Sequence, residues 1–244
     1  MPYAIVTRDH AGAEPYAAAL APLGLEVIAM PVTSHAAPRD PDAVRRAVIA
    51  GGFTAVIVAS VRAAAALVEV GLPLPEVWAI GPATARVMRG AGLGPVFEPA
   101  VRDVAELAFH VVRARAGGTG GPVLVPRAED GREEGIAILR AANIEVIDVV
   151  AYRTLAVARD DPSIATGLDL LVRGECAVCA VFAPSQVVAL DAVTSVAKLA
   201  TILVAFGDTT RAALEAAGGQ GVIVASQPTP EGVAKAVRAV YPRR

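Results

Sequence analysis

The sequence predicts an α/β protein in which parallel β-sheets carry helices on both faces. Short, nearly continuous apolar segments alternate with amphipathic segments along the chain, which is typical of sheets buried on both faces. Hydrophobic residues make up 55% and charged residues 19% of the 244 residues, a composition too apolar for a disordered chain. Related segments also recur in the two halves, which indicates two similar domains.

Apolar runs of strand length define the expected strands, and amphipathic stretches between them define the expected helices. In chain order, the strands are expected at residues 4–7, 26–31, 55–59, 77–80, 96–98, 122–126, 145–151, 176–182, 201–206 and 221–225. Helices are expected at residues 14–23, 41–50, 63–70, 83–90, 104–113, 131–142, 162–173, 186–192, 209–217 and 230–240.

An internal repeat links these elements. Four segments recur at offsets of 119 to 126 residues: 4–8 with 123–127, 20–28 with 139–147, 58–67 with 181–190, and 79–84 with 205–210. Loop insertions explain the drift in offset. By itself the repeat places the joint near residues 117–121 (GGTGG). We interpret this stretch as a flexible connector, because no Lys-Ser/Thr follows it to complete a phosphate loop.

Charge and the lengths of the apolar runs exclude several classes of partner. A formal net charge of −2 and a pI near 6.0 favour neither nucleic acid nor an anionic membrane. The mean hydropathy of +0.53 would suit a membrane protein, but the apolar stretches are far shorter than the ~20 residues of a spanning helix. The first residues carry no basic region, so no secretory signal is expected. We therefore expect a soluble, cytoplasmic protein.

Cys176 and Cys179 form a C-x-x-C motif, which we interpret as part of the core. Zinc needs four ligands, and the three histidines are scattered along the chain. The motif lies in an apolar segment that predicts a buried strand, whereas a redox motif belongs at a helix N-terminus. Because residues three apart on a strand face opposite sides of the sheet, we expect the two sulfurs not to meet.

Familiar catalytic motifs are absent. The sequence has no G-x-S-x-G, H-E-x-x-H or G-x-G-x-x-G pattern, and dispersed histidines offer little for a Ser–His or Cys–His mechanism. The carboxylates of residues 129–134 lie beside arginines, as in a solvated helix start. No metal or nucleotide cofactor is implied.

What recurs instead is a small or polar residue where a strand ends and a helix begins. In a parallel sheet these junctions share one edge, where ligands bind, and helix starts offer unpaired N–H groups to a carboxylate or phosphate. Simple N-capping is the alternative for any single Ser or Thr. The number of junctions favours an anion site lined mostly by backbone. The candidates are Thr7, Arg8, Ser60, Gly81, Thr84, Arg127, Ala183, Ser185, Gly207, Thr209, Thr210 and Thr229.

The motifs at these junctions follow a particular order. They are residues 7–8 (TR), 58–60 (VAS), 79–85 (AIGPATA), 150–154 (VAYRT), 182–185 (FAPS), 206–210 (FGDTT) and 226–232 (SQPTPEG). Each is weak alone. In this order and spacing, over nearly the whole chain, they resemble the uroporphyrinogen-III synthase family.

The resemblance implies a discontinuous arrangement rather than a split near residue 118. Residues 1–33 and 154–244 would form one domain, and residues 36–151 an inserted domain. Two adjacent crossing strands, at about residues 30–35 and 151–154, would join them, and turn residues near both boundaries are compatible with this. The expected fold class is therefore α/β, with two similar domains, each a parallel β-sheet flanked by helices, joined by a two-strand linker.

The resemblance also implies a function. Members of the family cyclise the linear tetrapyrrole hydroxymethylbilane to uroporphyrinogen III, with loss of water and inversion of ring D by way of a proposed spiro intermediate. We expect this reaction in a cleft between the domains of a monomer, with hydroxymethylbilane as the partner, no cofactor, and no nucleic acid or membrane.

Roles for individual residues follow from the same resemblance. Tyr152 matches the tyrosine of the family's crossing segment, and its phenol would act as general acid toward the departing hydroxyl. A packed linker tyrosine is the alternative. Thr209 and Thr210 would bind substrate carboxylates, with Ser60, Thr84 and Ser185 in parallel roles.

Three positions depart from the family pattern. Ala183 stands where the family usually has serine, which removes one hydroxyl from the candidate substrate-binding site. Arg62 replaces a small polar residue, and Asn143 replaces a glycine near a helix end, where Asn also adopts the left-handed conformation.

Two other functions remain open. One is a non-catalytic tetrapyrrole- or small-anion-binding regulatory protein with the same two-domain fold. The other is an α/β enzyme for a phosphorylated or nucleotide substrate, against which the missing glycine-rich phosphate fingerprint argues.

Overall fold

The chain divides into two compact units. The computed structural model describes residues 2–101, 103–115 and 120–241. Unit 1 comprises Met1–Ser34 and Leu155–Arg244, and unit 2 comprises His35–Thr154. Of the glycine-rich stretch expected to be a connector, residues 117–119 lie outside the described residues.

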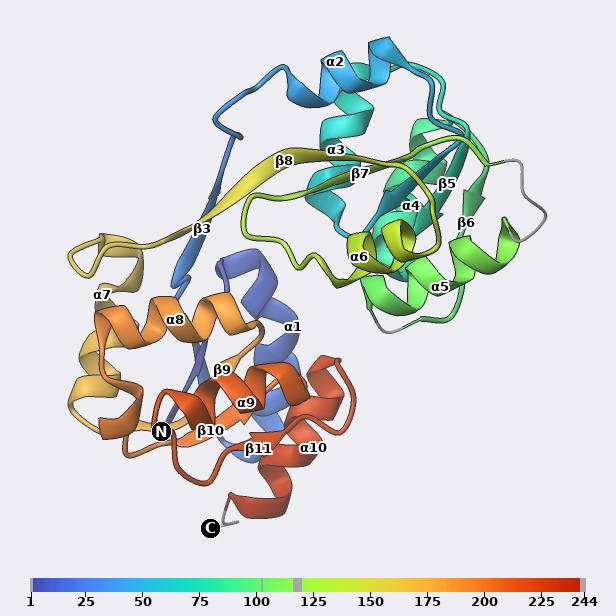
Figure 1. Cartoon of the computed structure of the whole chain (residues 1–244). Coiled ribbons are helices and arrows are strands. Elements are labelled where there is room, and N and C mark those ends of the chain that lie inside the picture. Colours follow the sequence, from blue (N-terminus) through green and yellow to red (C-terminus); the bar gives the residue numbers. More distant parts are fainter. Residues whose placement is uncertain (1, 102, 116–119, 242–244) are drawn as a thin grey trace. The chain divides into compact units, whose positions relative to one another are not determined.

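Unit 1 contains a five-stranded sheet in the order β11-β10-β9-β1-β2. Figure 1 labels the helices of the unit together with β9, β10 and β11 of this sheet. All of its pairings are parallel, so the carboxyl ends of the strands share one edge. The strands are β1 (Tyr3–Val6), β2 (Glu26–Ala29), β9 (Cys176–Val181), β10 (Ile202–Ala205) and β11 (Ile223–Val224). The helices are α1 (His10–Leu20), α7 (Pro162–Val172), α8 (Pro184–Val193), α9 (Asp208–Ala216) and α10 (Pro230–Val240), with short 3-10 turns at Ala21–Leu23 and Val196–Lys198.

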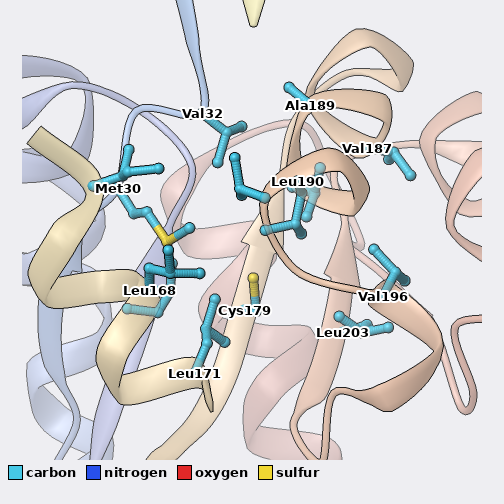
Figure 2. Close-up of a cluster of buried hydrophobic side chains, with 14 of the residues drawn as sticks. Met30, Val32, Leu168, Leu171, Cys179, Val187, Ala189, Leu190, Val196 and Leu203 are labelled. Carbon is cyan, nitrogen blue, oxygen red and sulfur yellow. The ribbon is translucent and has the colours of Figure 1, made fainter. Parts of the chain in front are cut away.

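Successive side chains along the strands of unit 1 point to opposite faces of the sheet, so each face carries a hydrophobic core. Helices α7, α8 and α9 cover one face, where Leu168, Leu190 and Leu214 are buried. Figure 2 shows part of this cluster, in which Met30, Leu171 and Cys179 also pack. Helices α1 and α10 cover the other face, through a cluster that includes Tyr16, Leu20, Phe182, Val233 and Val237.

Unit 2 contains a six-stranded sheet in the order β3-β8-β7-β4-β5-β6. Strands β4 to β8 pair in parallel. The strands are β3 (Thr33–Ala36), β4 (Ala55–Val58), β5 (Glu76–Ala79), β6 (Val96–Phe97), β7 (Val123–Ala128) and β8 (Val146–Ala156). One face is covered by α2 (Ala43–Ala50), α3 (Val61–Val70) and α4 (Gly81–Ala91), and the other by α5 (Val104–Ala114) and α6 (Glu134–Ala141).

The chain passes between the units along two neighbouring strands, β3 and β8. Strand β8 extends to Ala156, five residues beyond the expected end at Ala151. Hydrogen bonds hold the strands together: Arg153 Nε donates to the Ala37 carbonyl at 2.9 Å, and the Val157 N–H donates to the Val32 carbonyl at 2.9 Å. The predicted fold class, including the two-strand linker, is thereby confirmed.

The expectation for the two cysteines is half wrong. Both are free and buried, as predicted, but both belong to the same cluster on one face of the sheet. The register shifts where Tyr3 pairs with Cys176 and Ala4 with Val178, which leaves Ala177 unmatched. This extra residue resets the alternation, so Cys176 and Cys179 face the same side.

No helix in the described part of the chain is long and apolar enough to cross a membrane.

Candidate functional site

Two of the candidate hydroxyls act as helix caps. Ser60 Oγ accepts a hydrogen bond from the Ala63 N–H at 3.1 Å at the start of α3. Thr229 Oγ1 accepts one from the Gly232 N–H at 3.1 Å at the start of α10. The capping interpretation therefore explains these two residues, and their hydroxyls already use one acceptor site within the protein.

Three other helices begin after a strand with no side-chain cap from the described residues. Helix α4 starts at Gly81, whose φ of +74° is accessible mainly to glycine. Helix α8 follows Ala183 and helix α9 follows Gly207, and neither residue has a capping side chain. Proline stands at one of the first two positions of α4 and of α8 and has no N–H. The remaining N–H groups at the starts of α4, α8 and α9 lack a capping side chain from the described residues, which suits an external anion.

The threonines near these starts differ in exposure. Thr84 and Thr210 are buried, with relative exposures of 4% and 2%, whereas Thr209 and Ser185 are exposed. The Thr84 and Thr210 hydroxyls make no hydrogen bond to a described residue. Among the described residues, the buried side-chain oxygen that lacks a partner is that of Thr201. The Thr84 and Thr210 hydroxyls are therefore accessible and can serve a ligand at the helix starts.

Thr7 connects neighbouring segments at the carboxyl edge of the unit 1 sheet. It is buried, and its hydroxyl lies 3.0 Å from the Ala180 carbonyl and 2.8 Å from Gln186 Oε1. The same Gln186 oxygen accepts from the Phe182 N–H at 3.0 Å. These contacts tie the ends of β1 and β9 to the first turn of α8, so Thr7 positions the edge.

Sequence reasoning missed Gln186. It is the third residue of α8, three positions after the Ala183 cap. A Glu or Gln at that position is known to reach back to a backbone N–H before the helix, and this spacing could have identified it.

The two candidate arginines have different surroundings. Arg127 Nε and Nη2 donate to the two oxygens of Asp148 at 2.7 and 2.9 Å, and Nη2 also reaches Glu133 at 3.2 Å. Its Nη1 donates to the carbonyl of Ala128, the last residue of β7, and to those of Glu129 and Gly131 in the loop before α6. The hydrogen bond with Asp148 raises the pKa of Arg127. With these donors engaged, Arg127 organises the loop. Arg8 has no such partner among the described residues.

Tyr152 lies on β8, beside the strand that brings His35. The two rings meet edge to face with centroids 5.9 Å apart, and His35 Nδ1 lies 3.5 Å from Thr154 Oγ1. Tyr152 is half-buried, so its ring is held by neighbours while part of it stays accessible. This arrangement suits a phenol that delivers a proton, and the sequence did not indicate His35 as its neighbour.

The described residues contain no group of three or more His, Cys, Asp or Glu that could hold a metal. Backbone N–H groups, hydroxyls and an arginine lie at strand ends of the two units, and the Tyr152 phenol lies within β8. Groups of the first three kinds can accept a carboxylate, and a phenol can donate a proton.

Comparisons with known proteins identify relatives of this architecture. A family model described as uroporphyrinogen-III synthase HemD matches residues 14–235. A mutant uroporphyrinogen III synthase from the extremely thermophilic bacterium Thermus thermophilus superposes with a TM-score of 0.62 at 19% identity, covering 98% of this chain and 99% of that one. Uroporphyrinogen-III synthetase from Helicobacter pylori 26695 gives a TM-score of 0.64 at 16% identity, covering 98% and 100%. A comparison with curated proteins finds no match.

Proposed function

This chain belongs to the uroporphyrinogen-III synthase family, and we propose that it cyclises hydroxymethylbilane to uroporphyrinogen III with loss of water and inversion of ring D. As a hydro-lyase it would need no cofactor. The observation that carries this proposal is the set of helix starts at α4, α8 and α9 that lack a capping side chain. Each offers N–H donors to a carboxylate, and the substrate carries eight carboxylates.

Binding of the substrate carboxylates at helix starts suits a reaction whose outcome depends on the conformation of the substrate. Without an enzyme, the linear tetrapyrrole closes to the non-inverted isomer, so the protein must hold the chain in a conformation that directs attack to the other carbon. Orientation of this kind can supply roughly 7–11 kcal/mol of the barrier. A carboxylate at a helix N-terminus gains about 0.3–1 kcal/mol from the dipole, and several such contacts let a protein of net charge −2 hold an anionic ligand.

Tyr152 supplies the proton in this proposal. Its phenol donates a proton to the terminal hydroxyl of the substrate, which leaves as water. Ring D then forms a bond to the methylene carbon that carried the hydroxyl, and the proton that is lost when the pyrrole regains its aromaticity restores the phenol. One general acid contributes about 10²- to 10⁴-fold to the rate, which is a smaller share than orientation. Substrate carboxylates bind at the starts of α4, α8 and α9, to Gly81, Thr84, Ser185, Gly207, Thr209 and Thr210. Ser60 and Thr229, the caps of α3 and α10, contribute at the neighbouring helix starts.

The product isomer tests the proposal. Hydroxymethylbilane is generated in situ, the protein is added, the product is oxidised, and porphyrin isomers I and III are separated by chromatography. We expect isomer III to predominate. Isomer I at the level without enzyme, from a protein with a native circular dichroism spectrum, would contradict the proposal and favour the non-catalytic binding protein.

A further inference from the structure

The guanidinium of Arg8 lies against three aromatic rings in unit 1. Its Cζ is 4.3 Å from the ring centroid of Phe182, 5.6 Å from that of Phe206 and 5.8 Å from that of Tyr16. The rings also pack on one another, with the Phe182 centroid 4.9 Å from Tyr16 and 5.1 Å from Phe206. We call these three rings the aromatic cage. A cation within about 6 Å of a ring face is attracted by its π-electrons.

The topology of unit 1 places the cage at the carboxyl edge of the sheet. Arg8 follows β1, Phe182 follows β9 and Phe206 follows β10, and these strands are parallel neighbours in the order β10-β9-β1. Tyr16 comes from α1, which packs on the same face of the sheet as Phe182. The cation therefore stands beside the starts of α8 and α9, where N–H groups already favour an anion.

The aliphatic part, or stem, of the Arg8 side chain is also held in place, in addition to its guanidinium. A Cβ added at Gly12, in the first turn of α1, would lie 3.2 Å from Arg8 Cβ and 3.3 Å from Arg8 Cδ. Glycine at this position lets the stem pass along the helix. Contacts at both ends leave the long side chain little freedom, so less entropy is lost when it binds a ligand.

No carboxylate among the described residues pairs with Arg8. Its side chain has no ion pair and no hydrogen bond with a described residue, and it is half-buried. Arg127, the last residue but one of β7 in unit 2, is paired with two carboxylates. A half-buried charge usually has a partner. A guanidinium stacked on a ring keeps its in-plane N–H donors free, and these match the two oxygens of a carboxylate.

We propose that Arg8, held by the aromatic cage, binds one carboxylate of the substrate at the carboxyl edge of the unit 1 sheet. Tyr16, Phe182 and Phe206 are positioning residues that act through Arg8. The identity of the ligand rests on the proposed function, since hydroxymethylbilane supplies the carboxylate.

Steady-state kinetics of an Arg8→Gln variant test the contact. Loss of a charge-assisted contact raises KM about 10- to 100-fold, while kcat stays within about twofold and isomer III still predominates. Arg173→Gln is the matched control for loss of one charge in the same unit, because Arg173 pairs on the surface with Asp169. It leaves KM unchanged. An unchanged KM in Arg8→Gln overturns the proposal.

A double-mutant cycle tests whether the rings act through Arg8. Phe182→Leu raises KM about 3- to 10-fold in the wild-type background and has no further effect in Arg8→Gln. An equal rise in both backgrounds would show a purely structural role and overturn the positioning assignment. If Arg8→Gln does not fold by circular dichroism, Arg8→Lys replaces it, because it keeps the charge and loses the planar fork.

A binding measurement separates this inference from the proposed function. Uroporphyrin I, a fluorescent octacarboxylate, is titrated into the wild type and the variants without turnover. If the wild type forms no isomer III but binds uroporphyrin I at least tenfold more tightly than Arg8→Gln, the proposed reaction fails and the anion site stands. Equal binding by the two proteins, or none by the wild type, overturns the anion site.

Discussion

The rings of His35 and Tyr152 meet edge to face across the neighbouring strands β3 and β8, with an interplanar angle of 75°. Phenylalanine at position 152 would keep this ring contact and remove the phenol alone. We therefore expect Tyr152→Phe to fold normally and to lower kcat by about 10²- to 10⁴-fold, the usual share of one general acid.

Turnover by Tyr152→Phe is measured as the rate of isomer III formation. Tyr3→Phe is the control, because Tyr3 opens β1 at the amino end of the strand, and it should retain the wild-type rate. A wild-type rate in Tyr152→Phe would remove the acid role and leave a packed tyrosine.

Thr210→Val should separate binding from stability. The Thr210 hydroxyl has no partner among the described residues, so replacing it by an isosteric methyl should change the free energy of unfolding by less than about 1 kcal/mol. If this hydroxyl binds a substrate carboxylate, KM should rise about tenfold. Urea unfolding and initial rates measure the two quantities, and an unchanged KM would assign Thr210 to packing.

Arg127→Gln should affect stability more than binding. The change breaks a two-pronged contact with Asp148, in which the two side chains are 16% and 25% exposed, and should cost about 2 kcal/mol of unfolding free energy. Arg89→Gln, which breaks an exposed pair with Glu98, should cost less than about 1 kcal/mol. A large rise in KM at full stability would return Arg127 to the binding residues.

Ala183→Ser should stabilise the protein. Ala183 has the extended backbone of an N-cap, with φ −153° and ψ 154°, and no side chain to cap α8. A serine hydroxyl there should add about 1 kcal/mol and raise Tm by about 2–4 °C. Thermal unfolding checks this, and an unchanged Tm would show that the first N–H groups of α8 are already satisfied.

The buried thiols should make the protein sensitive to alkaline conditions. Burial raises the pKa of Cys176 to about 12, and burial also raises the pKa of Cys179. In the unfolded chain both thiols ionise near their ordinary value of 9.0. The folded state then holds protons that the unfolded state has lost, so stability is complete below pH 9 and falls as the pH rises toward 12.

Each thiol should contribute a slope of about 1.4 kcal/mol per pH unit in that window. Urea unfolding between pH 8 and 10.5 measures this slope, and the double variant Cys176→Ala, Cys179→Ala should flatten it. The same slope in the double variant would assign the alkaline sensitivity to other groups.

The apolar pattern was sufficient to predict the helices and the strands other than β3, because a strand covered on both faces must be apolar along its length and a helix start carries recognisable residues. Strand β3 (Thr33–Ala36) contains Thr, Ser and His, so the apolar pattern missed it, and only the family resemblance placed a crossing strand there. The left-handed conformation expected of Asn143 is also confirmed, with φ of +58°. Contacts between distant segments could not be predicted. Arg8 and Arg127 occupy matching places in the repeat, yet Asp148 on β8 engages one and Phe182 after β9 stacks on the other.

Ala177, which has no partner residue on β1, is a second example of a contact between distant segments that the sequence does not predict. Strand periodicity predicts that Cys176 and Cys179 face opposite ways, and a bulge against β1 reverses that result. The residues around Ala177 do not predict the bulge, because the bulge depends on how β9 pairs with β1, a strand more than 170 positions away in the sequence.

The pairing of β1 with β9 also determines the order in which the chain can mature on the ribosome. Unit 2 is one continuous segment, His35–Thr154, and can fold as soon as it has emerged. Strand β1 is synthesised before unit 2, but its neighbour β9 begins only at Cys176, after unit 2. The nascent β1–β2 segment must therefore wait with one edge unpaired while the inserted unit folds, and an exposed strand edge is a site of aggregation. The segment before unit 2 therefore completes its sheet only after unit 2 has been synthesised.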